Sequence, residues 1–251
     1  MEGLLNWLRG EQRSIKARFF RTPIERLELA LARLKGQTYT EWYAQRMNRQ
    51  ARNATNNGRP VRQWYLDDAE RQFEYAKRSG VLPTHNFLEF GCGIMRFGMY
   101  LAKYLEPGNY LGADISENRI KKGLGIAEEQ GIPLEQLRYA VLTTAEAKEL
   151  GEERFDVIWS YDVFPHMPID EFERCLIHLT ERLQPGGRIF MTFSRRDAPY
   201  SLNAKDYWFT WEQVQGVATR NGYSAEIQED WSTDFRLDVQ ADQTMVLLSR
   251  D

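Results

Sequence analysis

Cysteine, histidine and long apolar runs are all scarce in this chain of 251 residues. Its two cysteines, Cys92 and Cys175, are too few for a disulfide framework, so we expect a reducing, cytoplasmic setting. The three histidines lie far apart without the spacing of zinc ligands, and we predict no metal site. No apolar run approaches the ~20 residues that span a bilayer, and Asn6 and Arg9 interrupt the apolar start of the chain, which is unlike a secretory signal.

Charge is unevenly distributed, although the net charge is only −3. Residues 1–62 hold thirteen Lys or Arg and five Glu, a net charge of +8, so the remainder carries −11. A basic arm of this kind either binds an anion, nucleic acid or a membrane surface, or docks on its own acidic domain. We expect the docked arrangement, because arginines scattered on helices usually form a solvated face. Apolar side chains among basic ones in residues 3–20 also suit contact with a membrane surface.

The basic arm is predicted to contain three helices. The first covers residues 3–20, and the second begins at Thr22-Pro23, a typical helix start, and ends at Gly36. The third begins at Thr38 or Thr40 and continues to about Arg52. The second helix carries apolar residues at helical spacing: Ile24, Leu27, Leu31 and Leu34.

The third helix has an aromatic face, formed by Tyr39, Trp42 and Tyr43 together with Arg46. Such a face either packs on the body of the protein or closes over a ligand and forms one wall of a substrate site. We therefore divide the chain into an N-terminal helical arm or cap, residues 1–62, and a ligand-binding body, residues 63–251.

The body alternates between predicted strands and helices, which indicates a mostly parallel sheet with helices on both faces. A helix over residues 63–79 leads to Gly80, a typical C-cap glycine. The predicted strands cover residues 86–90, 109–114, 137–142, 154–160, 187–193, about 223–230 and 243–249. The helices between them lie near residues 95–105, 116–130, 144–150, 169–183 and 210–221.

The first strand leads into a glycine turn that is typical of nucleotide-binding corners. The apolar run Phe87–Phe90 contains one acid, Glu89, and Gly91-Cys92-Gly93 follows directly before helix-forming residues. Glycines let the backbone turn tightly beside a ligand, and the helix N-terminus offers free N–H groups. About twenty residues later the second strand ends in Asp114, which either accepts both ribose hydroxyls of a nucleotide or is a surface turn residue.

Four motifs in this order resemble those of the class I S-adenosylmethionine-dependent methyltransferases: Glu89-Phe-Gly-Cys-Gly93, Asp114, Phe155-Asp-Val-Ile158 and Leu183-Gln-Pro-Gly-Gly187. The resemblance covers roughly residues 64–251. It implies a Rossmann-like, seven-stranded α/β sheet whose last strand runs antiparallel between strands five and six, with S-adenosylmethionine as cofactor. One departure is Met95, which stands where the family often has a third glycine. A dinucleotide dehydrogenase, the rival interpretation, would prefer glycine at the next position, which is Arg96.

The resemblance implies cofactor contacts just after each strand. Glu89 either orients the amino-acid part of the cofactor or braces the loop, and Thr144 either accepts from the adenine amine or caps the next helix. Arg46 joins the set because its guanidinium is able to pair with the cofactor's carboxylate. The predicted cofactor-binding residues are Glu89, Gly91, Cys92, Gly93, Arg96, Asp114, Ile115, Thr144, Ser160, Tyr161 and Arg46.

The loop after the fourth strand, which lies by the reactive methyl group in this family, supplies the candidate catalytic residues. His166 is the candidate general base, since an unperturbed imidazole takes a proton near neutral pH, and Asp162 is the second candidate. Packing is the alternative role of His166. The predicted substrate-binding residues are Tyr39, Tyr43, Arg195 and Tyr207, and the arginine suits an anionic substrate.

The expected function is methyl transfer to a small-molecule acceptor by direct in-line displacement, with an oxygen as the expected acceptor atom. The helical arm and the second strand resemble bacterial methyltransferases of polysaccharide or secondary-metabolite pathways. One alternative is an RNA or protein methyltransferase that grips its substrate with the basic arm, although Asp162-Val-Phe-Pro165 differs from the tetrapeptide that base-amine methylation commonly uses. Another is a non-catalytic, cofactor-binding partner subunit. The oligomeric state is left open.

Overall fold

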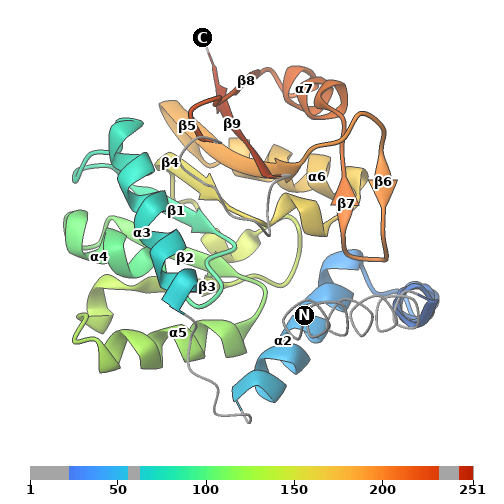
Figure 1. Ribbon diagram of the computed structural model, residues 1–251, viewed down its shortest axis with the longest axis horizontal. Helices are drawn as coiled ribbons and strands as arrows, with labels where there is room; N and C mark the ends of the chain where they lie inside the picture. The colour runs from blue at the N-terminus through green and yellow to red at the C-terminus, as the bar shows by residue number, and fades with distance from the viewer. Residues whose placement is uncertain (1–22, 56–62, 232–242, 251) are drawn as a thin grey trace, which may run out of the picture.

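The centre of the molecule is a seven-stranded sheet in the order β3-β2-β1-β4-β5-β9-β8 (Figure 1). The computed structural model describes residues 23–55, 63–231 and 243–250. Neighbouring strands from β3 to β5 are parallel, and β9 is antiparallel to both β5 and β8. The predicted Rossmann-like sheet, with its last strand antiparallel between strands five and six, is therefore confirmed. The strands are β1 (Phe87–Phe90), β2 (Tyr110–Asp114), β3 (Arg138–Val141), β4 (Phe155–Ser160), β5 (Leu183–Ser194), β8 (Ser224–Ile227) and β9 (Gln243–Ser249).

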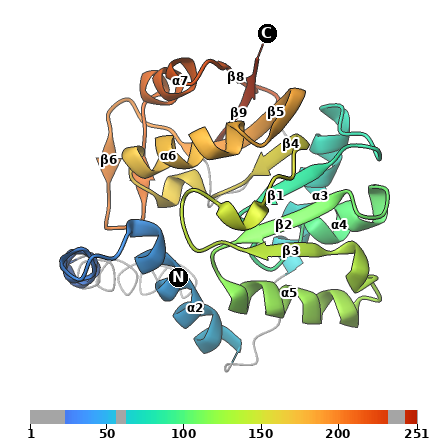
Figure 2. The ribbon, with the colours of Figure 1, turned by 180° about the vertical axis from the view of Figure 1, so that it is seen from behind.

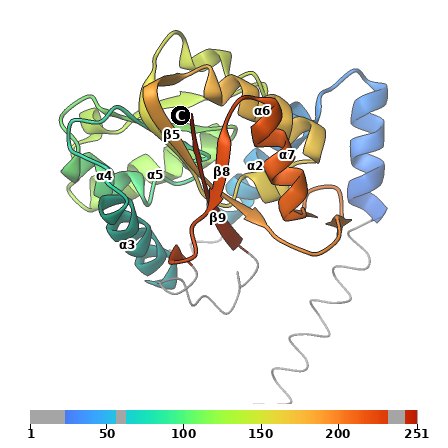
Figure 3. The same ribbon diagram turned by 90° about the horizontal axis from the view of Figure 1, so that it is seen from above.

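Side chains that alternate along the central strands form a hydrophobic core on each face of the sheet. In β4, Val157 and Trp159 belong to one core and Ile158 to the other. The first core is covered by α3 (Gln63–Arg78), α4 (Gly98–Tyr104) and α5 (Glu117–Glu129), and the second by α6 (Ile169–Thr180) and α7 (Trp211–Arg220). Figures 2 and 3 show the two groups of helices on opposite sides of the sheet.

Several predicted elements have different bounds or a different structure. The helix predicted near 144–150 is only a short 3-10 turn, η2 (Lys148–Leu150), because Ala147 adopts the left-handed conformation that ends a regular helix. Left-handed Met95 likewise delays α4 until Gly98. The helix predicted to reach residue 183 ends at Thr180, and β5 already pairs at Leu183.

A two-stranded hairpin, formed by β6 (Tyr200–Ser201) and β7 (Tyr207–Trp208), follows β5 in a segment for which no strand was predicted. No sequence pattern indicates this hairpin, because two-residue strands are too short for a periodic pattern.

The N-terminal part begins with helical residues 23–34 and continues into α2 (Tyr39–Thr55). Thr38 caps α2, since its hydroxyl accepts from the Glu41 N–H while the Glu41 carboxylate accepts from the Thr38 N–H. Buried Tyr39 and Trp42 pack with Leu29 and Ala32 on one side and with Ala204 on the other. The helix predicted over residues 3–20 lies outside the described residues, and none of the described helices is long and apolar enough to cross a membrane.

Candidate functional site

A cavity lies where the carboxyl ends of β1, β2 and β4 meet α2. Parallel strands deliver their following loops to the same edge of a sheet, so residues far apart in the sequence gather there. The sheet side of the cavity is formed by Phe90, Gly91, Asp114, Ile115, Arg119, Leu142, Thr144, Ala145, Asp162, Val163, His166 and Met167. The remaining lining residues come from α2 and α6: Tyr39, Thr40, Tyr43, Met47, Glu171 and Cys175.

Asp114 is fixed at the tip of β2 by the glycine turn. The N–H of Gly93 donates to Asp114 Oδ2 at 2.8 Å, and the N–H of Ser116 donates to Oδ1 at 2.7 Å. Gly91 has a φ of +82°, and a Cβ there would lie 2.1 Å from Val163 Cγ2, so both the turn and the packing require glycine. Burial raises the pKa of Asp114, while Arg119 and the two N–H donors oppose the rise.

Glu89 is buried inside the body and does not line the cavity. The Tyr110 hydroxyl donates to Glu89 Oε2 at 2.6 Å. Burial raises the pKa of Glu89 to about 7, although the Tyr110 hydroxyl and the charge of Arg96 lower it in part. The same carboxyl also accepts from the backbone N–H of Gly98 at the start of α4, and its predicted contact with the cofactor remains a prediction.

The far side of the glycine turn contains a second polar cluster. Arg96 Nη1 lies 2.9 Å from the buried carboxylate of Asp68 on α3, which also accepts from Gln72 Nε2 at 3.1 Å. Burial raises the pKa of the Tyr161 hydroxyl, with further contributions from Asp68 and Asp162. Ser160 is fully buried, and its hydroxyl has no hydrogen-bond partner within the described residues. Arg96, Ser160 and Tyr161 thus lie beside the turn but outside the lining of the cavity.

His166, in the wall of the cavity, stands between two carboxylates. It ends the short helix η3 (Phe164–His166) that follows β4. Its Nδ1 is 3.2 Å from Asp206 Oδ1 and 3.0 Å from the Lys205 carbonyl oxygen, and its Nε2 is 3.7 Å from Asp162 Oδ1. Burial lowers the pKa of His166, but the two carboxylates outweigh it and raise the pKa to about 9. His166 is therefore an imidazolium at neutral pH.

Asp162 and Asp206 are themselves held in place. The Gln243 side-chain amide donates to Asp162 Oδ1 at 2.7 Å, which ties β9 to the site. Asp206 accepts from Asn203 Nδ2 at 2.6 Å and pairs with Lys205 at 3.0 Å. Burial raises the pKa of Asp206, yet these partners and His166 together bring it well below its usual range.

The helix α2 closes the cavity with its aromatic face. The Tyr39 hydroxyl lies at hydrogen-bonding distance from the carbonyl oxygens of His166 and Ala204, at 2.5 and 3.0 Å. Tyr43 lines the cavity, and its ring centroid is 6.0 Å from that of His166. Asn48, one turn further on, accepts from Ser116 Oγ at 3.1 Å and from the Asn118 N–H at 3.2 Å. The predicted position of α2 beside the site is therefore what the structure shows.

Three other residues that were predicted to contact the cofactor or the substrate do not line the cavity. Arg46 pairs with Glu25 and, at 3.3 Å, with Glu28, so its guanidinium holds α2 to residues 23–34 and does not line the cavity. Arg195 is exposed at the end of β5. The Tyr207 ring packs edge-on against Tyr39 with centroids 6.4 Å apart, one layer behind the cavity. Their predicted contacts with cofactor or substrate stay predictions.

The comparisons with known proteins agree with this geometry. Residues 88–189 match the family model described as a methyltransferase domain. Residues 88–189 of this chain are thus a methyltransferase domain. The family recognised from the sequence is thereby confirmed, and S-adenosylmethionine is the cofactor that this domain uses. No protein of curated function matches the sequence.

Solved structures share the fold at low sequence identity. Magnesium protoporphyrin IX methyltransferase (ChlM) from Synechocystis PCC 6803, with bound S-adenosylmethionine, is 18% identical with a TM-score of 0.57, over 74% of this chain and 80% of that one. The CcbJ methyltransferase from Streptomyces caelestis is 16% identical with a TM-score of 0.57, over 73% of this chain and 90% of that one. DhpI in complex with S-adenosylhomocysteine is 14% identical with a TM-score of 0.57, over 84% and 95%.

The residues of this methyltransferase domain fit the cofactor. Each Asp114 oxygen accepts one backbone N–H and keeps the capacity to accept a ribose hydroxyl. The Thr144 hydroxyl is buried beside the cavity and makes no hydrogen bond of good geometry within the described residues. The pKa of the nearby Glu146 carboxyl is lowered, first by the backbone N–H of Glu146 itself and then by the Thr144 hydroxyl. The Thr144 hydroxyl suits the polar edge of an adenine ring, and the apolar side chains of Ile115 and Leu142 suit its face.

Sequence reasoning missed several residues that build this candidate site. Arg119, Met47, Thr40 and Glu171 line the cavity, and Asp206 contacts His166. The Thr40 hydroxyl donates to the buried Glu171 carboxylate, which also pairs with Arg174 at 3.1 Å. A buried carboxylate such as Glu171 requires a polar partner. Which residue is that partner depends on how α2 packs against α6, and the sequence alone does not show this.

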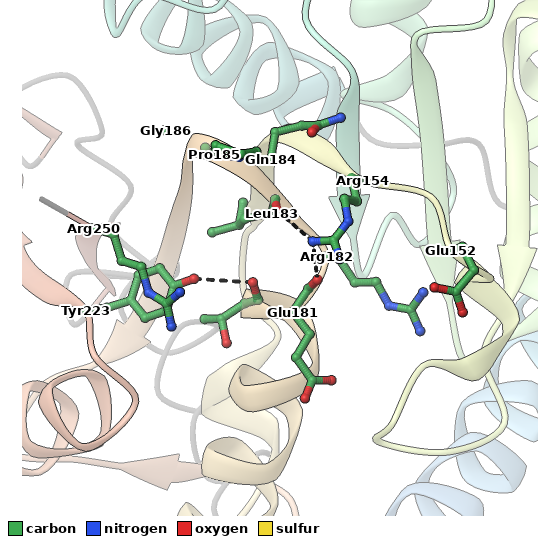
Figure 4. A pocket seen from close by; sticks show the side chains of 12 residues that line it. Glu152, Arg154, Glu181, Arg182, Leu183, Gln184, Pro185, Gly186, Tyr223 and Arg250 are labelled. Carbon is green, nitrogen blue, oxygen red and sulfur yellow. Dashed lines mark hydrogen bonds between the residues drawn. The ribbon is translucent and has the colours of Figure 1, made fainter.

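A second, open groove lies at the opposite, amino-terminal end of the sheet (Figure 4). There Arg154 donates to the carbonyl oxygens of Glu181 and Leu183 at 3.0 and 3.2 Å, and the Tyr223 hydroxyl donates to that of Thr180 at 3.2 Å. The groove is lined by side chains of both charges, and the only motif among its lining residues is Leu183-Gln-Pro-Gly-Gly187. We therefore assign the chemistry to the smaller cavity at the carboxyl end. Within the described residues, no group of side chains has the composition of a metal site.

Proposed function

We propose that this chain transfers the methyl group of S-adenosylmethionine to an oxygen of a small-molecule acceptor by direct in-line displacement. The observation that carries the proposal is one cavity lined by two chemically distinct groups of residues. Asp114 and Thr144 form one group, and His166 with Asp162 forms the other. The first group suits a nucleoside and the second group suits a hydroxyl that loses its proton.

Bound S-adenosylmethionine supplies a methyl group on a positively charged sulfur, which makes the methyl carbon electrophilic. The acceptor oxygen forms the new bond to that carbon while the carbon–sulfur bond breaks, and the bonding electrons stay on sulfur. The acceptor proton moves to a base. The protein's own contribution is to align the two partners, exclude water and receive that proton.

His166 is the proposed base, in its neutral form, and Asp162 and Asp206 stabilise the imidazolium that results. The same two carboxylates keep most of the His166 population protonated at neutral pH, because they raise its pKa to about 9. The active fraction therefore grows as the pH approaches 9. A base of this strength matches a hydroxyl of phenolic acidity, with a pKa of roughly 10, better than an aliphatic alcohol.

The cap, residues 1–62, is proposed to control access to this cavity above a catalytic body, residues 63–251. Support comes from Tyr39, Thr40, Tyr43 and Met47, which provide the α2 wall of the cavity. An enclosed wall of aromatic side chains favours a small acceptor over an RNA or protein segment. The free, buried thiols of Cys92 and Cys175 suit the reducing cytoplasm.

A screen with isotopically labelled S-adenosylmethionine tests the proposal. Phenols, aliphatic alcohols and carboxylic acids are compared as acceptors, with bulk RNA and unfolded protein in parallel reactions. We expect label in a phenolic or similarly acidic hydroxyl compound. Label only in RNA or protein would reject the small-molecule assignment, and cofactor binding without transfer to any class would favour the non-catalytic partner subunit.

A further inference from the structure

Glu171 lies in the wall of the cavity, although the proposed methyl transfer does not use it. It stands in the first turn of α6 and is only 4% exposed. The Thr40 hydroxyl donates to its Oε1, and Arg174 Nη1 donates to its Oε2 at 3.1 Å. A carboxylate accepts up to about four hydrogen bonds, so each oxygen keeps the capacity to accept one more from a ligand.

The surroundings of Glu171 include the segment that follows β3. Cys175, one turn further along α6, also lines the cavity and belongs to the same core cluster as Leu142. Burial raises the pKa of the Cys175 thiol, and the charges of Glu171 and Glu146 raise it further. Glu146 is the acid that the Thr144 hydroxyl approaches. Glu171 and the segment after β3 therefore both lie near Cys175, on the same cavity.

The acidic side chains of the cavity are suited to different parts of a ligand. Asp114, Asp162 and Glu171 are the acids among its lining residues in the part of the chain that the structure describes. Asp114 is assigned to the ribose, and Asp162 is assigned to His166, so these assignments leave Glu171 unused. An ionised carboxylate only accepts hydrogen bonds, whereas a threonine hydroxyl both donates and accepts. Glu171 is therefore able to distinguish a donor on the ligand from an acceptor.

We infer that Glu171 recognises the 6-amino group of the cofactor's adenine ring and rejects a 6-oxo purine. The edge of adenine presents a donor, the 6-amino group, beside an acceptor, the ring nitrogen N1. The Glu171 carboxylate accepts from the amine, and the Thr144 hydroxyl donates to N1. A 6-oxo purine would turn an oxygen toward the buried carboxylate with no proton between them, and this repulsion provides the specificity.

The contact with Thr40 gives Glu171 a second, structural role, because it ties α2 to α6. That role concerns the two helices and does not depend on the substituent at position 6 of a purine. The ratio of the affinities for two purine ligands therefore separates recognition from structural support. The inference concerns the cofactor alone and does not depend on the identity of the methyl acceptor.

Isothermal calorimetry on the full-length chain with S-adenosylhomocysteine and S-inosylhomocysteine tests the inference. The second ligand carries a 6-oxo group in place of the 6-amino group. We expect the wild type to bind S-adenosylhomocysteine roughly tenfold to a hundredfold more tightly, since one hydrogen bond to a charged group is at stake. Glu171→Gln should lose most of this preference, because a carboxamide both donates and accepts. It keeps the size of the side chain and an oxygen for the Thr40 hydroxyl.

The matched control is Glu173→Gln, on the same helix. Glu173 pairs with Arg220 at 2.8 Å and does not line the cavity, so this variant should keep the wild-type preference. Circular dichroism checks the fold of both variants. An equal loss of affinity for the two ligands in Glu171→Gln, with their ratio unchanged, would overturn the inference and leave Glu171 its structural role alone. A wild type without preference would overturn it too, and a wild type that binds neither ligand would overturn the cofactor assignment as well.

Discussion

At the scale of single residues, the proposed ribose contact depends on the carboxylate of Asp114 at the tip of β2. An acid at the tip of the second strand was predicted to hold a ribose, and two backbone N–H groups fix its carboxylate at the cavity. That carboxylate is buried, so an unpaired charge there would be costly unless a ligand or N–H donor compensates it.

Replacing Asp114 with Ala should weaken binding of both S-adenosylmethionine and its demethylated product by tenfold or more. The reason is the loss of two hydrogen bonds to a charged group, worth roughly 1.5–3 kcal/mol each. Isothermal calorimetry measures the change, and Asp197→Ala, at an exposed position, is the control. Unchanged affinity in a folded Asp114→Ala protein would reject the ribose assignment.

His166 shows how tertiary contacts alter a residue that the sequence identified. The sequence suggested a base with an ordinary pKa, and the structure places two carboxylates beside the imidazole. Turnover should therefore rise with pH up to about 9, the raised pKa of His166. Asp206→Asn should move that rise to lower pH, and His166→Ala should lower turnover by ~10²–10⁴ with cofactor affinity nearly intact. A pH profile that Asp206→Asn leaves in place would return His166 to a packing role.

The same pKa shift makes a prediction about stability. The folded-state pKa of His166, about 9, lies above its ordinary value of 6.5. Its contribution to the free energy of unfolding is therefore fully present below pH 6.5 and is lost as the pH rises toward 9. Urea denaturation at pH 6 and pH 9 should show a smaller loss of stability for Asp206→Asn than for the wild type. An equal loss in both proteins would argue that other groups control this pH range.

At the scale of elements, the β1–α4 corner is the most constrained part of the fold. Gly91→Ala should destabilise the protein by roughly 1–3 kcal/mol and abolish tight cofactor binding, because the new Cβ would meet Val163 at 2.1 Å and φ is +82°. Gly125→Ala is the matched control. Gly125 lies within α5 with no atom near its added Cβ, so alanine there should stabilise the helix by up to ~1 kcal/mol. Equal stabilities of the two variants would contradict this account of the corner.

At the scale of the whole molecule, the cap and the body contribute different parts of the structure. The body contains the complete sheet and both of its cores, whereas the cap contributes α2 to the cavity. Deletion of residues 1–62 should leave a folded domain with poor turnover. Circular dichroism and a methyl-transfer assay on the native acceptor measure the two properties. Full activity after the deletion would disprove the role of the cap.

The sequence by itself determined the strands and helices of most of the body and the position of Asp114 at the end of the second strand. Alternating apolar segments, the glycine turn and Asp114 act through local rules, since a strand, a tight turn and a helix N-terminus each depend on residues close in the chain. These rules locate the strands, the tight turn and Asp114 along the chain, whereas the order of the strands in the sheet was implied by the resemblance to the methyltransferase family. Two helices were predicted too long for a reason that is also local. Met95 and Ala147 adopt the left-handed conformation, which the sequence does not indicate because neither residue is glycine.

Only the tertiary structure decided what surrounds His166 and what the cap touches. Asp206 is forty residues from His166 and Gln243 is eighty-one from Asp162, so no local pattern connects them. Arg46, predicted to meet the cofactor, pairs with Glu25 and Glu28 because α2 and residues 23–34 fold back on each other. That fold also leaves Ile24, Leu27, Leu31 and Leu34 exposed, because Leu29 and Ala32 on the opposite side of the helix pack against Trp42.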